Sequence, residues 1–212
     1  MKLYYITDRL QFAGNSREQE RRLLEKIAEC AAAGVDWVQL REKDLSTRAL
    51  KELAGKAMAA MGGSGTRLLI NSRTDVALAC GAHGVHLPSN DLAASEVRAI
   101  LMRAGAAEPV IGVSAHSAAE ISSAEAHGAD FAVFAPVFEK SGLTNPEGLV
   151  QLRRVCNRQD AAQPPMPVVA LGGVTLKNAQ QCIEAGAAGI AAIRLFQEND
   201  VLVVVKKLRE AT

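Results

Sequence analysis

The sequence predicts an α/β protein in which eight strand–helix units close into a single barrel. Three observations support this fold: strand-like and helix-like segments alternate along the chain, one glycine-containing junction recurs between them, and eight such units fit within 212 residues. Strands that alternate with helices form a parallel sheet with crossover helices. In a chain of this length, eight units favour the (β/α)8 TIM barrel, although an open doubly wound sheet would produce the same local pattern.

The recurring junction consists of an alanine-rich amphipathic stretch, a glycine and then a short apolar run. It occurs at Ala33-Gly34, Cys80-Gly81, His127-Gly128 and Ala185-Gly186. Glycine just past a helix end readily adopts the left-handed conformation that caps a helix, and the apolar run after it is typical of a buried strand. The junction therefore indicates where each helix ends and the next strand begins.

Apolar runs and helical periodicity define the expected elements, and no linker divides residues 1–212, so one barrel domain is predicted. Ser46, Ser117 and Thr175 are expected to be N-caps. Strands are predicted at Leu3–Thr7, Trp37–Val38 and the residues after it, Leu68–Asn71, Val85–Leu87, Val110–Ser114, Phe131–Phe134, Val168–Leu171 and Ile190–Ile193. Helices are predicted at about Ser16–Ala33, Ser46–Met61, Thr74–Cys80, Ala94–Arg103, Ser117–His127, Pro146–Asn157, Leu176–Ala185 and Val201–Glu210.

Composition limits the classes of function that need consideration. The chain is 49% hydrophobic and 22% charged with a net charge of +1, which is ordinary for a globular protein and argues against nucleic-acid or polybasic membrane binding. The apolar run after Met1 is too short for a signal peptide or a spanning helix, so a cytoplasmic protein is expected. The four cysteines lie in helix-like segments without metal-ligand spacing, which favours reduced, buried thiols over zinc binding.

The segment after the second predicted strand places an amide and two cations at alternate positions. In an extended chain, Gln39, Arg41 and Lys43 would point to the same side. Two aligned cations at a strand end favour an anionic ligand such as phosphate or pyrophosphate. A solvated strand end with incidental charges is the alternative interpretation.

Polar residues follow the other predicted strands as well. In a barrel these positions meet at the C-terminal face, where active sites lie. The polar strand ends are Asn71-Ser72-Arg73, His86 with Asp91, Ser114-Ala115-His116, Pro136 to Lys140, Gly172-Gly173 and Arg194. So many polar endings on one face predict a functional site there.

Two of these strand ends suggest particular chemistry. Gly172-Gly173 precedes a helix and favours phosphate binding by backbone N–H groups, although a tight turn would use the same residues. His116 follows Ser114 closely, but no acidic residue is placed to orient it, so hydrolase chemistry is not expected. Asp91 could cap the following helix or bind magnesium together with substrate oxygens and water.

The remaining histidines are interpreted as structural. His83 and His127 lie near predicted helix C-termini, where a partial positive charge is favourable, and His86 lies within a predicted strand.

Taken in order, the motifs resemble the thiamine phosphate synthase and thiazole tautomerase family. The resemblance extends from Tyr5 to Ile190, covers nearly the whole chain, and implies a small barrel. It rests on Gln39-x-Arg41-Glu42-Lys43, Ile70-Asn71, Gly84-Val85-His86-Leu87 with Asp91, Gly112-Val113-Ser114-Ala115-His116 and Leu171-Gly172-Gly173-Val174.

For a synthase, the resemblance implies coupling of hydroxymethylpyrimidine pyrophosphate to a thiazole phosphate with release of pyrophosphate. It implies that Asp91 helps to bind Mg²⁺, and the residues predicted to be catalytic are Arg41, Lys43, Ser114 and His116. The remaining implied roles are contact with the pyrimidine for Gln39, with pyrophosphate for Arg41, Lys43, Asn71 and Ser114, and with the thiazole phosphate for Gly173, Ile193 and Arg194.

The chain departs from the synthase pattern at three places. Ser72 stands where synthases place a second metal-binding aspartate, the segment from Phe138 to Leu143 replaces a threonine-rich loop, and Arg194 replaces a small residue. Lys140 and Arg194, both expected to contact substrate, could compensate as fixed cations for the lost metal ligand.

These departures leave two alternatives to a synthase. One is a thiazole tautomerase, an isomerase of the thiazole carboxylate phosphate in which His116 moves a proton. The other is a non-catalytic thiazole-phosphate-binding relative. The sequence also leaves open whether the chain forms a homo-oligomer.

Overall fold

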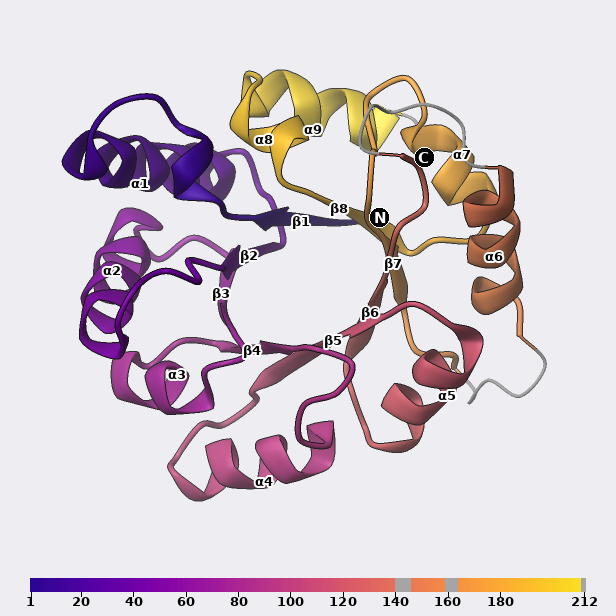
Figure 1. Ribbon diagram of the computed structural model, residues 1–212, viewed down its shortest axis with the longest axis horizontal. Coiled ribbons are helices and arrows are strands. Elements are labelled where there is room, and N and C mark those ends of the chain that lie inside the picture. Colours follow the sequence, from indigo (N-terminus) through magenta and orange to yellow (C-terminus); the bar gives the residue numbers. More distant parts are fainter. Residues whose placement is uncertain (140–145, 159–163, 211–212) are drawn as a thin grey trace.

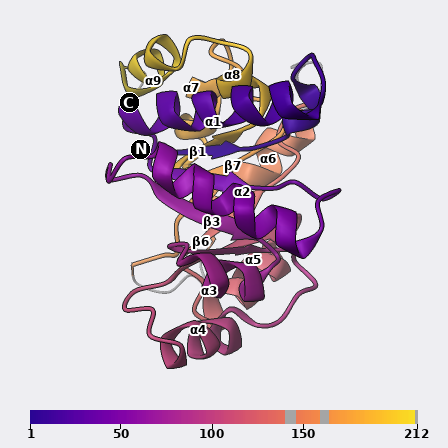
Figure 2. The same cartoon turned by 90° about the vertical axis from the view of Figure 1, so that its left-hand side faces the viewer.

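The computed structural model describes residues 1–139, 146–158 and 164–210. Within this part of the chain, eight parallel strands form a closed barrel in which each strand pairs with the next and β8 pairs with β1. The helices surround the strands, and α1 and α2 lie side by side on the outside (Figures 1 and 2). The predicted (β/α)8 barrel is confirmed.

The strand positions agree with the predicted ones to within a few residues. The strands are β1 Lys2–Ile6, β2 Trp37–Leu40, β3 Arg67–Asn71, β4 Gly84–Leu87, β5 Val110–Ala115, β6 Phe131–Phe134, β7 Val168–Ala170 and β8 Gly189–Ala192. Adjacent strands pair in parallel register, as in Asn71 opposite His86 and Gly112 opposite Phe131. The carboxyl ends of the strands therefore meet at one end of the barrel, called the C-terminal end below.

The helices also follow the predicted pattern. They are α1 Ser16–Ala32, α2 Thr47–Ala60, α3 Thr74–Cys80, α4 Ala94–Arg103, α5 Ala118–Ala126, α6 Pro146–Cys156, α7 Ala179–Glu184, α8 Arg194–Gln197 and α9 Val201–Glu210, with a 3-10 turn η1 at Arg9–Gln11. Among these described helices, none has the length and apolar character needed to cross a bilayer.

The helix-to-strand junctions have the geometry that the repeated sequence pattern predicts. Gly34, Gly81, Gly128 and Gly186 all have positive φ angles, between 67° and 101°. The backbone therefore turns from each helix into the following strand through a conformation that side chains other than glycine rarely adopt.

Two of the three predicted N-caps are confirmed. Ser46 and Ser117 each accept a hydrogen bond from the backbone N–H three residues later. The prediction for Thr175 was wrong, because α7 begins only at Ala179. The Asn178 side chain instead accepts a hydrogen bond from the Thr175 N–H at 2.7 Å and donates to the Gly173 carbonyl at 3.1 Å, which holds this segment as a loop.

Two short elements, η1 and α8, were not predicted from the sequence. With three and four residues respectively, they are shorter than the window over which helical periodicity becomes visible. Both lie at the C-terminal end of the barrel, directly after β1 and β8. They therefore contribute to the surface where the functional site was expected.

The barrel interior is filled by a small apolar cluster, separate from the larger core between strands and helices. Trp37 and Phe131 stack with ring centroids 4.2 Å apart and planes inclined by 8°, and Tyr4 meets Phe131 edge-on at 5.5 Å. The interior cluster comprises Tyr4, Ile6, Leu69, Val110, Phe131, Val133, Val169 and Ala191. These side chains pack the barrel, so ligand access is confined to its C-terminal end.

The cysteines lie in helices, as predicted, and are present as free thiols. Cys30 and Cys182 are buried, whereas Cys80 and Cys156 are only half-buried. Burial raises the pKa of the Cys156 and Cys182 thiols to about 12, which keeps them protonated at neutral pH.

Candidate active site at the C-terminal end of the barrel

The second strand directs Gln39 and Arg41 toward the barrel axis. Gln39 is buried, and its side-chain amide donates a hydrogen bond to the Tyr4 hydroxyl at 2.9 Å. Arg41 is half-buried, and its backbone N–H donates to the Thr7 hydroxyl at 2.9 Å. Its guanidinium lies close enough to His86 to lower the pKa of that imidazole. Arg41 thus brings a permanent positive charge to the open end of the barrel.

Lys43 does not share the surface of Arg41, contrary to the alternation expected for a continuous strand. Strand β2 ends at Leu40, and the chain turns at Lys43 and Asp44. Lys43 instead lines a cavity of about 330 Å³ together with Asn71 and Ser72, whereas Arg41 lines a different cavity. The two cations therefore approach the C-terminal end from different sides.

Glu42, between the two cations in sequence, points into a buried network. Its carboxylate accepts hydrogen bonds from the Thr7 hydroxyl at 2.5 Å, the Arg9 backbone at 3.1 Å and the Arg9 guanidinium at 3.1 Å. Arg9 also binds both carboxylate oxygens of Asp44. Burial raises the pKa of Glu42, and the hydrogen bonds from Thr7 and Arg9 oppose that shift. Sequence reasoning did not identify this network.

Ser72 and Asp91 lie next to each other after β3 and β4. The Ser72 hydroxyl donates to Asp91 Oδ2 at 2.9 Å, and its backbone N–H donates to the His86 carbonyl at 2.8 Å. Ser72 adopts a φ of 61°, which is uncommon for a residue with a side chain and often marks functional segments. Asn71, just before it, is half-buried at the end of β3.

The donor set around Asp91 suits only a magnesium ion that takes most of its ligands from elsewhere. Among the described residues, no group of three or more histidine, cysteine, aspartate or glutamate side chains could hold a metal. Asp91 already accepts hydrogen bonds from Ser72 and from the Leu92 N–H. Mg²⁺ commonly uses one or two carboxylates with water and substrate phosphates, so Asp91 with the Ser72 hydroxyl fits such a substrate-dependent site.

His86 and Ser114 form a polar pair across β4 and β5. His86 Nε2 and the Ser114 hydroxyl are 2.9 Å apart, and burial followed by the charge of Arg41 lowers the pKa of His86 to about 3. Nδ1 has no hydrogen-bond partner among the described residues. A side chain at position 112 would collide with the imidazole and with Phe131, so Gly112 provides the space for both rings.

The interpretation of His86 as a structural residue therefore missed its contact with a predicted site residue. The available signal was strand alternation: His86 on β4 and Ser114 on β5 both occupy inward-facing positions.

His116 lies at the exposed end of β5, beside the cavities rather than within them. Its Nδ1 lies 2.7 Å from the Ala135 carbonyl oxygen, which can only accept, so Nδ1 carries the proton. Its backbone N–H donates to Glu120 at 2.7 Å. His116 is not among the residues lining the cavities that contain Arg41, Lys43 or Asp91.

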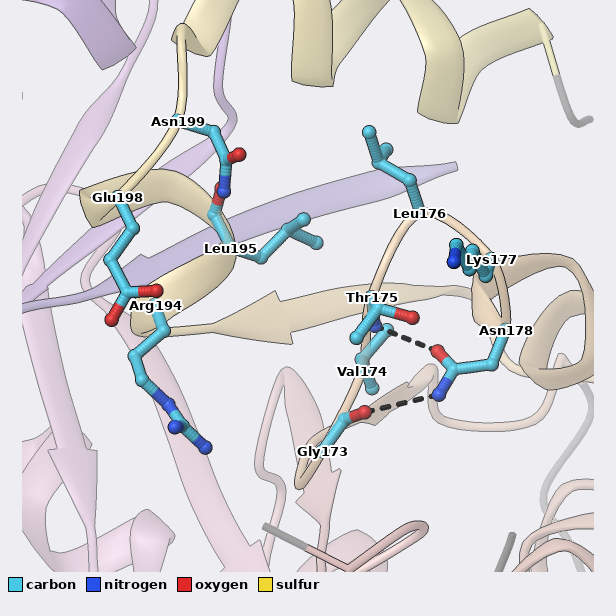
Figure 3. Close-up of a pocket in the computed structure, with 10 residues that line it drawn as sticks. All are labelled: Gly173, Val174, Thr175, Leu176, Lys177, Asn178, Arg194, Leu195, Glu198 and Asn199. Carbon is cyan, nitrogen blue, oxygen red and sulfur yellow. Dashed lines mark hydrogen bonds between the residues drawn. The ribbon is translucent and has the colours of Figure 1, made fainter. Parts of the chain in front are cut away.

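The loops after β7 and β8 border two neighbouring cavities that share several lining residues. The first cavity, of about 650 Å³, is lined by Arg41, Gly172 and Ile193. The second cavity, of about 540 Å³, lies between the Gly173–Asn178 loop and α8 (Figure 3). The residues common to both include Gly173 and Arg194. Gly173 has a φ of 61°, and a side chain there would collide with the Glu139 carbonyl.

Helix α8 is fixed to the loop after β1 by a buried glutamine. Gln197 accepts a hydrogen bond from the Tyr5 hydroxyl at 2.9 Å and donates to the Asp8 carbonyl at 2.8 Å. These hydrogen bonds hold Ile193 and Arg194 in place relative to the loop after β1. Thr7, in the same loop, accepts a hydrogen bond from the Arg41 backbone N–H. Sequence reasoning missed Gln197 because its partners are 189 and 192 residues away.

The altered segment after β6 is described only in part. Phe138 is buried and lines the 650 Å³ cavity, and Gln11 of η1 lines it from the opposite loop. Gln11 was not among the residues predicted for the site, and Phe138 was named there only as part of the segment from Pro136 to Lys140. Lys140, predicted to contact substrate, lies outside the described residues.

Comparison with known proteins agrees with the fold. Residues 3–196 match the family model described as thiamine monophosphate synthase. The chain is 41% identical over 194 residues to a putative thiamine-phosphate synthase of Geobacter sulfurreducens, covering 90% of this chain and 84% of that protein. It is 35% identical to a thiamine-phosphate synthase of Syntrophomonas wolfei, covering 98% of this chain and 94% of that protein.

Among solved structures, thiamine phosphate pyrophosphorylase from Pyrococcus furiosus superposes with a TM-score of 0.78 at 29% identity, covering 99% of this chain and 94% of the other. The family model spans nearly the whole barrel, from β1 to α8, and so includes every strand end described above. The chain belongs to the thiamine monophosphate synthase family.

Proposed function

We propose that this protein is a thiamine-phosphate synthase, a transferase that joins hydroxymethylpyrimidine pyrophosphate to a thiazole phosphate and releases pyrophosphate. The main support is one cavity of about 650 Å³ that is lined both by Arg41 and by Gly173, Ile193 and Arg194. A site that joins two anionic substrates needs positive charge or backbone donors at both of its ends. The names of the relatives agree with this assignment.

The leaving pyrophosphate would be held by Arg41, Lys43, Asn71 and Ser114, which line three different cavities of the molecule. Breaking the carbon–pyrophosphate bond leaves negative charge on the departing group, and fixed cations stabilise that charge without having to reorganise. Arg41 is half-buried, which strengthens its attraction for an anion relative to that of an exposed side chain. The contact between the Ser114 hydroxyl and His86 Nε2 holds the Ser114 side chain in place.

Asp91, with the Ser72 hydroxyl beside it, would hold Mg²⁺ against the pyrophosphate. When bound, this ion would neutralise part of the charge that develops on the leaving group. Because one carboxylate is present instead of two, the affinity for the metal should depend strongly on the substrate.

The pyrimidine would lie against Gln39, whose amide is fixed by Tyr4. The positive charge that forms on the pyrimidine when the bond breaks must be kept from water, and Phe138 and Leu171, which line the 650 Å³ cavity, would serve that purpose. The thiazole phosphate would meet the backbone of Gly173, Ile193 and Arg194. Both proposed substrates are phosphorylated and do not cross membranes unaided, so we place the reaction in the cytoplasm.

A direct assay tests this function. Purified protein is incubated with both substrates and magnesium, and thiamine phosphate is measured by chromatography. Omitting either substrate, or adding a chelator, supplies the controls. We expect product only in the complete mixture. No product from well-folded protein would contradict the assignment.

Two observations keep thiazole tautomerase as the second candidate. Ser72 replaces a metal ligand, and the His116 ring is held through Nδ1 by the Ala135 carbonyl, which leaves Nε2 as the basic atom. A tautomerase needs such a proton carrier, whereas a synthase needs departure of pyrophosphate.

The variant His116→Asn separates the two activities. We expect coupling to fall by less than about tenfold, because His116 lies beside the cavities that would hold the substrates. Both coupling and thiazole isomerisation are measured on wild type and variant. Isomerisation in wild type that collapses by about 10²–10⁴-fold in the variant, without any coupling, would establish the tautomerase instead. A protein that binds thiazole phosphate and catalyses neither reaction would be the non-catalytic relative.

A further inference from the structure

We propose that Arg9 is a positioning residue that neutralises the charge of Glu42 beside the anion site and thereby leaves Arg41 available to the pyrophosphate. This inference rests on the proposed function, and it concerns a residue two contacts away from the substrate. The problem it addresses arises from the sequence: a glutamate stands directly between two cations that are needed to bind an anion.

The first support is the orientation of Glu42. Its carboxylate is buried, and among the described residues its hydrogen-bond donors are the Thr7 hydroxyl, the Arg9 backbone and the Arg9 guanidinium. No hydrogen bond or ion pair in the described part of the chain joins it to Arg41 or Lys43. The negative charge nearest to the two cations in sequence is therefore satisfied by a third cation.

The second support is the geometry of Arg9 itself. Its guanidinium is only slightly exposed and binds the Glu42 carboxylate with one nitrogen while both terminal nitrogens bind Asp44. A planar guanidinium held at two carboxylates has little freedom to turn toward a ligand. Arg9 is consequently unsuited to bind substrate but well suited to fix two acidic side chains.

The third support is that the same network reaches the backbone of Arg41. The Thr7 hydroxyl donates to Glu42 and accepts from the Arg41 N–H at 2.9 Å. If Arg9 were absent, the buried carboxylate would lack a cation, and the neighbouring Arg41 and Lys43 would be drawn toward it. Substrate would then compete with Glu42 for those cations.

Electrostatic competition predicts a specific pattern of rescue. Arg9→Met should raise KM for the pyrimidine pyrophosphate by at least about tenfold and leave KM for the thiazole phosphate within about twofold. Adding Glu42→Gln to Arg9→Met removes the competing charge and should restore KM to within about threefold of wild type. Arg9→Lys, which keeps the charge, should retain most of the affinity.

Arg98→Met is the matched control. Arg98 also bridges an aspartate, Asp130, and two backbone carbonyls, but it lies beside the beginning of β5 and β6, at the opposite end of the barrel. The Arg98→Met variant should have the same KM as wild type for both the pyrimidine pyrophosphate and the thiazole phosphate. Circular dichroism and urea unfolding establish that each variant is folded, and Arg9→Lys decides the question if Arg9→Met does not fold.

The affinity of each variant for inorganic pyrophosphate, measured by calorimetry, makes the test independent of coupling. If wild type binds pyrophosphate but forms no thiamine phosphate, the proposed function fails while the Arg9 series still applies. A double variant as impaired as Arg9→Met would show that Arg9 acts only by holding the loop, and would overturn the proposal. Unchanged affinity in Arg9→Met, a large loss in Arg9→Lys, or a wild type that does not bind pyrophosphate would also overturn it.

Discussion

At the N-terminal end of the barrel interior, Trp37 stacks on Phe131, and Tyr4 packs edge-on against Phe131. Toward the C-terminal end, the inward-facing positions are instead occupied by the polar side chains of Gln39 and His86. The same strands supply both sets: Trp37 and Gln39 are two residues apart on β2. Because inward-facing positions recur at every second residue, a strand changes from core to site within about 7 Å. The comparison indicates that one end should govern stability and the other ligand binding.

The largest expected effect is at the apolar end. Phe131→Ala should lower the free energy of unfolding by about 3–5 kcal/mol, because it leaves a cavity beneath Tyr4 and Trp37. Urea unfolding measures the loss. The fraction of the variant that is still folded should keep its KM for both substrates within about threefold. A large change in KM without a loss of stability would contradict the proposed division between the two ends.

The charged residues at the open end should show the reverse pattern. Arg41→Ala and Lys43→Ala should each weaken binding of the pyrophosphate substrate by about 1.5–3 kcal/mol, the usual contribution of a hydrogen bond to a charged group. Lys51→Ala, on the exposed surface of α2, is the control. Titration with the substrate measures affinity, and urea unfolding should show only a small change. Unchanged affinity in both variants would mean that these cations are ordinary surface charges.

His86 lies at the boundary and should affect stability through pH. Its folded pKa of about 3 is below the unfolded value of about 6.5, so between these values the unfolded chain binds a proton that the folded chain does not. Stability should therefore fall as pH drops below 6.5, by about 1.4 kcal/mol per pH unit, or about 2 kcal/mol by pH 5. Above pH 6.5 this contribution is constant.

His86→Gln cannot titrate and keeps a polar group near Ser114. Urea unfolding of wild type and variant across this pH range isolates the histidine, because the carboxylates titrate in both proteins. Parallel curves for the two proteins would show that His86 takes up its proton without unfolding.

The smallest effect is expected at Ser72, outside the barrel interior. Ser72→Asp should increase the affinity for Mg²⁺ by roughly tenfold, because it adds a second carboxylate next to Asp91. Aspartate tolerates the positive φ at this position. Magnesium titration of coupling activity compares wild type, Ser72→Asp and Ser72→Ala. Coincident curves for wild type and Ser72→Asp would place the metal elsewhere.

The local repeats predicted the alternating strands and helices, and eight units in a chain of this length favoured the barrel over an open doubly wound sheet. Each glycine junction and each apolar run is a property of adjacent residues, and short-range preferences repeated eight times leave few possible topologies. The strand ends were predictable for the same reason, since parallel strands place all their carboxyl ends together. The order of residues along the chain was thus enough to assign Gly173 and Arg41 to the same end of the molecule.

Only the tertiary structure decided which side chains meet at that end. Ser72 contacts Asp91 across 19 residues, Arg9 contacts Glu42 across 33, and Gln197 contacts Tyr5 across 192. No periodicity encodes such contacts, because they depend on barrel closure and on the path of each loop. The turn at Lys43 and the side-chain bonds of Asn178 likewise override the expectations of strand alternation and helix capping. Local sequence therefore determined the barrel and its open end, while long-range packing determined the arrangement of charges within it.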